Sequence, residues 1–83
     1  MKRVKREHVI PGTLLAVRSG KTLTLDAHLY LSGVSRELPD GTSLIVVTGP
    51  RKKDNINLVR VRINECDEYE CFYCDVLTQC EVA

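Results

Sequence analysis

The residues best suited to chemistry in this chain are four cysteines near its end, spaced C-x4-C-x2-C-x5-C (Cys66, Cys71, Cys74 and Cys80). Four thiolates can hold Zn²⁺ in a tetrahedral site, and a C-x2-C pair is the usual half of such a site. The first three cysteines, with spacings x4 and x2, also match the cysteine run that holds the iron–sulfur cluster of plant-type ferredoxins. The spacing alone therefore allows a small metal-binding module.

The element that carries these cysteines argues against a metal. The apolar and aromatic residues from Tyr69 to Leu77 predict a final β-strand. In a strand, Cys71 and Cys74 would lie about 10 Å apart on opposite faces, and Zn–S bonds of about 2.3 Å cannot span that distance. We therefore interpret the cysteines as small buried side chains and expect no cofactor, with a four-cysteine zinc module as the alternative.

A second candidate site is basic. Residues 1–62 carry twelve Lys and Arg against five Asp and Glu, whereas residues 63–83 carry six acids and no Lys or Arg. Such basic side chains could contact an acidic partner protein or follow phosphates, with Tyr30 or Tyr73 stacking on bases. The candidate binding residues are Lys2, Arg3, Lys5 and Arg6 at the N-terminus, and Arg51, Lys52, Lys53, Arg60 and Arg62 further on.

The alternative for two of these cations is an ordinary structural role. A turn at Asn64–Glu68 between two antiparallel strands would place Glu68 and Glu70 opposite Arg62 and Arg60. Opposite charges at such positions form cross-strand pairs. The basic stripe would then be neutralised along part of its length.

Catalysis has little support. Asp26 and His28 are spaced i, i+2 and could form a carboxylate–imidazole pair, but a nucleophile such as Cys71 would join them only by coincidence of folding. Neither a nucleophile elbow nor a glycine-rich phosphate loop is present in the sequence. A chain of 83 residues also has little room for the shell that supports a catalytic site. We expect a non-enzymatic protein without a small-molecule substrate.

The elements that would position these residues are short strands in one domain. Five or so strands at intervals of about 8–12 residues predict an all-β fold, a small barrel or sandwich. Residues 1–8 would form a flexible basic arm, and 32–40 a loop. The predicted strands are 13–17, an alternating stretch from Leu23 to Leu31, 42–48, 56–63 and 69–77. The strand 42–48 would be buried on both faces and would end at Gly49-Pro50. A charged tip at 51–55 would connect it to the strand 56–63.

The compartment expected from the sequence is the cytoplasm. No apolar run approaches the ~20 residues of a membrane span. The basic start resembles that of a secretory signal, but Pro11-Gly12 and Arg18 break the apolar stretch that should follow. Free thiols in a reducing cytosol agree with this expectation.

From Leu38 to Leu77 the sequence resembles a bacterial SH3-like domain. The similar segments are LPDGTSLIVV (38–47), LVRVRI (58–63) and ECFYCDVL (70–77), the last through Phe72 and Leu77. The resemblance implies a five-stranded SH3-like barrel. Aromatic residues line the family's peptide groove, but those positions here are Leu58, Cys71 and Val76, and a glycine of the family is replaced by Glu70.

These departures favour the family's fold without its peptide-binding activity. We therefore expect a small module that docks on another protein as a regulator or inhibitor, in the setting of a phage or other mobile element. The contrast between its basic and acidic parts would steer association. A nucleic-acid-binding barrel is the first alternative, and the zinc module is the second.

Overall fold

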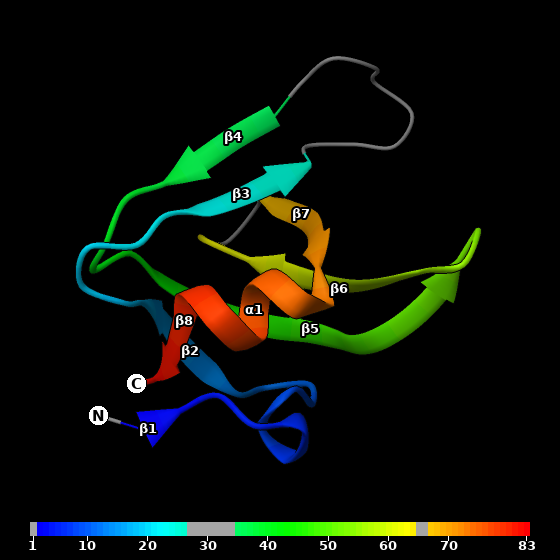
Figure 1. The fold of residues 1–83 in the computed structure, drawn as a ribbon, viewed down its shortest axis with the longest axis horizontal. Coiled ribbons are helices and arrows are strands. Elements are labelled where there is room, and N and C mark those ends of the chain that lie inside the picture. Colours follow the sequence, from blue (N-terminus) through cyan, green and yellow to red (C-terminus); the bar gives the residue numbers. More distant parts are fainter. Residues whose placement is uncertain (1, 27–34, 65–66) are drawn as a thin grey trace.

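A computed structural model describes residues 2–26, 35–64 and 67–83. These residues form eight strands, a 3-10 helix η1 (Arg6–His8) and one short α-helix, α1 (Tyr73–Gln79) (Figure 1). The predicted all-β class is confirmed, although the strands number eight rather than five. They are β1 (Lys2–Arg3), β2 (Leu14–Val17), β3 (Leu23–Asp26), β4 (Ser35–Leu38), β5 (Ser43–Lys53), β6 (Ile56–Arg62), β7 (Glu68–Phe72) and β8 (Cys80–Val82).

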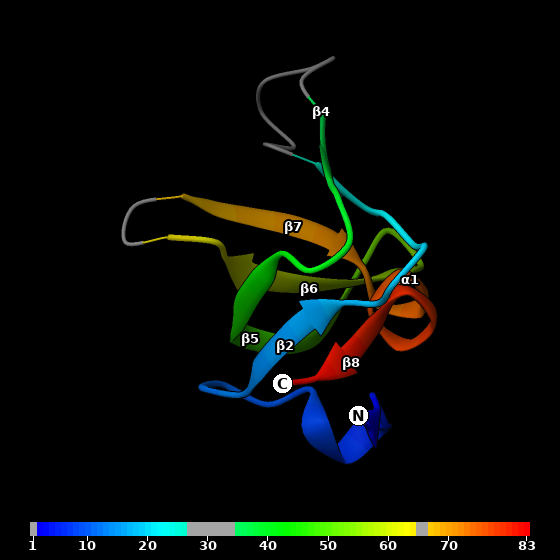
Figure 2. The same ribbon diagram turned by 90° about the vertical axis from the view of Figure 1, so that its left-hand side faces the viewer.

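The strands form one antiparallel sheet with the order β1-β8-β2-β5-β6-β7-β3-β4. β2 and β3 are four positions apart in this order, which would separate them by about 19 Å in a flat sheet. The chain nevertheless connects them through a tight turn at Arg18–Lys21, in which the Lys21 amide donates to the Arg18 carbonyl. The sheet must therefore curl, as Figure 2 shows. The curl is barrel-like but not closed, since β1 and β4 are its two ends.

The core lies inside the curl. The alternation in β2, β5 and β6 turns apolar side chains inward, and no charged or polar side chain among the described residues is buried. Removing these side chains from water is the main force that holds the sheet curled. The buried set is Val4, Val9, Leu15, Val17, Leu23, Leu25, Leu38, Leu44, Val46, Leu58, Val59, Val61, Cys71, Val76 and Cys80.

The β5–β6 hairpin is longer than predicted. β5 passes through Gly49 and Pro50 instead of ending there, with register shifts between Val46 and Arg51 that absorb both residues. A side chain at Gly49 would approach the Val9 carbonyl oxygen to 2.9 Å, so glycine lets the N-terminal segment lie close. The prediction that this strand is buried on both faces is wrong, because its buried and partly exposed residues alternate and residues 50–53 are exposed.

The predicted last strand, Tyr69–Leu77, is half wrong. β7 ends at Phe72, and the chain then forms α1, with Val76 fully buried. Helical spacing turns Tyr73, Val76 and Leu77 toward the core, and α1 contacts β3, β6, β7 and β8. A short β8 follows and completes the sheet beside β2.

Two segments predicted to be irregular belong to the fold. Instead of a flexible arm, β1 pairs with β8, with Arg3 opposite Glu81, and Val4 and Val9 anchor the segment in the core. Within the predicted loop 32–40, β4 pairs with β3 and buries Leu38. The predicted strand positions Leu29 and Leu31 lie outside the described residues.

Candidate binding surface

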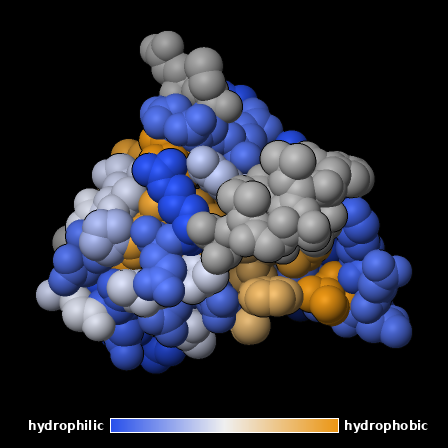
Figure 3. All heavy atoms as spheres, turned by 90° about the horizontal axis from the view of Figure 1, so that it is seen from above, coloured by the Kyte–Doolittle hydropathy of each residue, from blue (hydrophilic) through white to orange (hydrophobic). Residues whose placement is uncertain are grey.

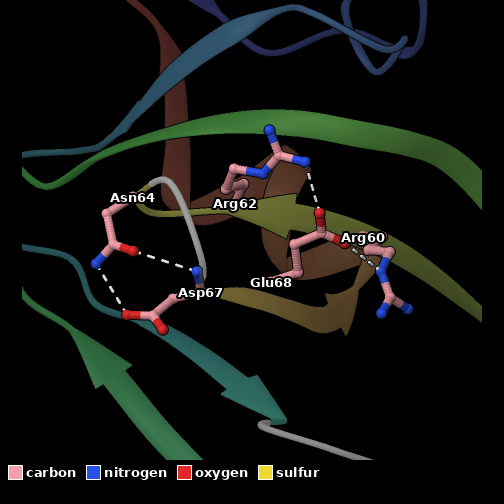
Figure 4. Close-up of polar contacts among 5 residues, drawn as sticks. All are labelled: Arg60, Arg62, Asn64, Asp67 and Glu68. Atoms are coloured by element: carbon pink, nitrogen blue, oxygen red, sulfur yellow. Dashed lines mark hydrogen bonds and ion pairs between the residues drawn. The ribbon is translucent and has the colours of Figure 1, made fainter.

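The outer face of β6 and β7 carries an Arg–Glu–Arg cluster (Figure 4). The register places Arg62 opposite Glu68 and Arg60 opposite Glu70, as the sequence predicted. Arg60 Nε donates to Glu68 Oε1 at 2.8 Å, and an Nη of Arg62 donates to Glu68 Oε2 at 2.6 Å. One carboxylate thus binds both guanidinium groups, and two of the five cations of the predicted basic stripe are partly neutralised.

The cluster shapes the electrostatics of this face. Hydrogen bonds from Arg62 and Arg60 lower the pKa of Glu68 below its ordinary value of 4.5. The cluster is solvated, with Arg60 and Arg62 side chains 40% and 42% exposed, so water and salt weaken the pairing. Arg62 Nε is itself buried and has no hydrogen-bond partner among the described residues.

We expect replacement of Glu68 by Gln to lower stability near pH 7, and the difference from wild type to shrink in acid. Because the folded pKa of Glu68 lies below 4.5, its contribution is present above that pH and disappears as the pH falls through the folded value. Urea unfolding of both proteins between pH 7 and pH 2 measures this. Glu37→Gln, at an exposed position of β4, is the control; a gap between Glu68→Gln and wild type that stays constant with pH would contradict the prediction.

The turn beside this cluster is fixed by side chains. Asn64 Nδ2 donates to Asp67 Oδ2 at 2.8 Å, and the Asp67 amide donates to Asn64 Oδ1 at 3.2 Å. Arg36 of β4 reaches the same corner, with Nη1 3.8 Å from Asp67 Oδ2 and 3.3 Å from the Tyr69 hydroxyl. Arg36 was not singled out from the sequence, since its partners are more than thirty residues away. These contacts hold β4 to β7.

The remaining cations of the predicted stripe occupy the hairpin end. Arg51, Lys52 and Lys53 are exposed at the end of β5, and Asp54 and Asn55 form the tip with φ of 52° and 66°, as two-residue hairpin turns require. This end projects along the 34 Å axis of a molecule 23 Å across (Figure 1). Seen from above in Figure 3, it is a hydrophilic end next to a small hydrophobic area. Of these three cations, Arg51 lies opposite Leu58, whereas Arg60 and Arg62 of the same strand as Leu58 pair with Glu68.

A surface hollow lies beneath the hairpin. It has a volume of about 510 Å³ and is lined by Arg6 of η1, Pro50 of β5, Asn57 of β6 and Tyr73 of α1. Of the predicted N-terminal binding residues, Arg6 lines this hollow, while Lys2, Arg3 and Lys5 are exposed on the same segment. Sequence patterns carry no signal for the hollow because its walls come from four separate elements.

The cysteines are divided between the core and the surface. Cys71 and Cys80 are buried, and Cys71 Sγ lies 3.6 Å from the Val59 carbonyl oxygen as a weak donor. Burial raises the pKa of Cys71 and raises the pKa of Cys80 to about 12. Cys74 is exposed on α1, and Cys66 lies outside the described residues.

The structure therefore describes only some of the candidate metal-binding and catalytic residues. Within residues 2–26, 35–64 and 67–83, no three His, Cys, Asp or Glu side chains gather as a metal site would require. The zinc module involves Cys66 and stays a prediction. His28 of the Asp26–His28 pair and Tyr30 also lie outside the described residues. The positions of the family's groove aromatics, Leu58, Cys71 and Val76, are buried rather than available to a peptide.

No protein-family model, curated protein or solved structure matches the chain. The SH3-like resemblance accordingly stays a prediction. In the part of the chain that the structure describes, no helix has the length and apolar character needed to cross a membrane.

Proposed function

We propose that the chain is a non-enzymatic binding module that docks on another protein through the end of the β5–β6 hairpin. The observation that carries the proposal is that this end extends past the core with residues 50–57 exposed. Residues 51–54 combine three cations with one acid, a net charge of +2. An ordered, projecting and charged element that buries little of itself is suited to intermolecular contact.

The surface near this end favours a protein over a nucleic acid as the partner. Ile56, opposite Lys53 on the hairpin, is 45% exposed, and Phe72, opposite Leu58, is 48% exposed. Apolar and aromatic side chains among cations are typical of protein interfaces. A phosphate backbone would instead call for a continuous run of unpaired cations, and Glu68 interrupts that run at Arg60 and Arg62.

A small regulator or inhibitor is the role that fits such a module. An 83-residue chain with a short projecting recognition element can block or bridge a partner's surface without chemistry of its own. We place it in the cytoplasm, where its cysteines stay reduced, and in the setting of a phage or other mobile element. A zinc-dependent module remains the second alternative to this role.

Nucleic-acid binding is the first alternative, and one observation favours it. A two-stranded ribbon with Arg51, Lys52 and Lys53 near its tip has the form of elements that enter the major groove. Such binding must weaken linearly with salt on logarithmic axes, in proportion to the phosphates neutralised.

Site-specific photo-crosslinking tests the docking proposal. Ile56 and Leu14 are 45% and 50% exposed, so a photoreactive residue at each gives a matched pair on different parts of the surface. In a lysate of the source organism, we expect a discrete protein adduct from position 56 and not from position 14. Purified partner should then bind the unmodified chain. Equal adducts from both positions, or complexes that disappear with nuclease, would overturn the proposal.

A further inference from the structure

The hollow beneath the hairpin lies where the inward face of the sheet leaves the core. Asn57 is two residues before Val59 and four before Val61, so all three share one face of β6. Val59 and Val61 are fully buried, whereas Asn57 is exposed and lines the hollow. The face of β6 that is buried at Val59 and Val61 is therefore exposed at Asn57, where it forms a polar wall of the hollow.

The other walls are anchored by the fold. Tyr73 packs against the hydrophobic core at the start of α1. Arg6 belongs to η1, whose neighbours Val4 and Val9 are 5% and 2% exposed. The close approach of Val9 to Gly49 fixes this segment against β5 beside Pro50. A hollow whose walls are fixed in advance loses less entropy when a ligand binds.

The charge of the hollow points to an anionic ligand group. The exposed Arg6 side chain is part of its lining. Lys52 is the cross-strand neighbour of Asn57 and therefore lies on the same face of the hairpin. Asn57 and Tyr73 carry neutral hydrogen-bonding groups. A carboxylate entering here would meet Arg6 in the lining, with Lys52 on the same face of the hairpin.

We propose that this hollow receives an acidic segment of the partner protein, with an Asp or Glu side chain directed to Arg6 and Lys52. The hollow is open to solvent, and its volume of about 510 Å³ is sufficient for a few side chains of a partner. The apolar surfaces of Pro50 and Tyr73 suit the aliphatic part of a peptide better than a bare phosphate. This inference rests on the proposed docking function and specifies the chemistry of the partner.

Paired peptide libraries test the ligand chemistry. One library carries Glu at two fixed positions in a random twelve-residue background, and its match carries Gln there. We expect the Glu library to be retained about tenfold or more above the Gln library at low salt, the range for hydrogen bonds to charged groups. Equal retention of the two libraries would overturn the inference.

Charge-removing variants locate the site. Arg6→Gln with Lys52→Gln should reduce retention of the Glu library about tenfold or more. Lys21→Gln with Arg36→Gln removes the same charge at exposed positions away from the hairpin and the N-terminal segment, and should reduce it less than about twofold. Equal losses in the two pairs would indicate a general charge effect and overturn the inference. Tighter retention of short RNA, with a salt dependence of several charges, would assign the hollow to nucleic acid instead.

The same variants separate this inference from the docking proposal. If a partner found through position 56 binds Arg6→Gln, Lys52→Gln with unchanged Kd, the hollow is not the site although docking stands. If the Glu library is retained through Arg6 and Lys52 but position 56 yields no protein adduct, the docking proposal for the hairpin fails. The preference of the hollow for acidic peptides then still stands.

Discussion

In the native protein, we expect Cys80 to react with a neutral thiol reagent about a thousandfold more slowly than in denaturant, whereas exposed Cys74 stays reactive. Burial raises the pKa of Cys80 from an ordinary 9.0 to about 12, which lowers its thiolate fraction at pH 8 by about a thousandfold. The thiolate is the reactive form. Cys74 is exposed on α1 and lacks this protection. Cys71, also buried, should be as protected as Cys80.

The measurement is mass spectrometry of peptides from a Cys66→Ser variant labelled with iodoacetamide over time. This variant removes the one cysteine outside the described residues and leaves Cys71, Cys74 and Cys80 to be compared. In denaturant all three should react at similar rates, which serves as the control. Rapid native labelling of Cys71 or Cys80 would contradict their place in the core. In the wild-type chain, protection of Cys74 by one equivalent of zinc would instead support the zinc module.

The sequence predicted the centre of this fold well because the determining signals there are local. Alternation in β6 placed Val59 and Val61 inward and Arg60 and Arg62 outward, as observed. The turn after β6 then set the register that brings Glu68 opposite Arg62. A short turn between alternating strands leaves few other pairings, since a slip of one residue would turn every side chain to the wrong face.

The missed elements depend on contacts that are distant in sequence. β1 is two exposed basic residues whose strand partners, Glu81 and Val82, lie at the other end of the chain. β4 lies within the segment 32–40 that the sequence predicts as a loop before the Pro39-Asp40-Gly41 turn, and it is ordered by pairing with β3. The hollow combines Arg6 with Tyr73 for the same reason. No local pattern of charge or hydropathy encodes such pairs.

The sequence of the α1 segment does contain a local helical pattern. Tyr73, Val76, Leu77 and Cys80 are spaced as one helical face, i, i+3, i+4 and i+7, and all four contact or join the core. The prediction followed the apolar and aromatic residues from Tyr69 to Leu77, which favour a strand. Propensity is a weak guide over seven residues, and packing against the curled sheet decides the outcome.

Two single variants, one with aspartate at Val76 and one with aspartate at Cys74, distinguish a helix from a strand in this segment. We expect Val76→Asp to lower the free energy of unfolding by about 4 kcal/mol or more, enough to unfold much of an 83-residue domain. Val76 is fully buried, and the carboxylate would have no partner in the apolar core. Cys74→Asp should change stability by less than about 0.5 kcal/mol, because Cys74 is exposed in the first turn of α1. Urea unfolding followed by circular dichroism gives both values.

The pair is decisive because residues 74 and 76 share one face of any strand but not of a helix. If this segment were extended, the two aspartates would both be tolerated or both be damaging. Since Val76→Asp alone could leave too little folded protein to measure, Val76→Ala provides a graded value, an expected loss of about 2 kcal/mol from two methyl groups and the cavity they leave. Equal effects of the two aspartates would place a strand where α1 lies, and would remove with it the Tyr73 wall of the hollow.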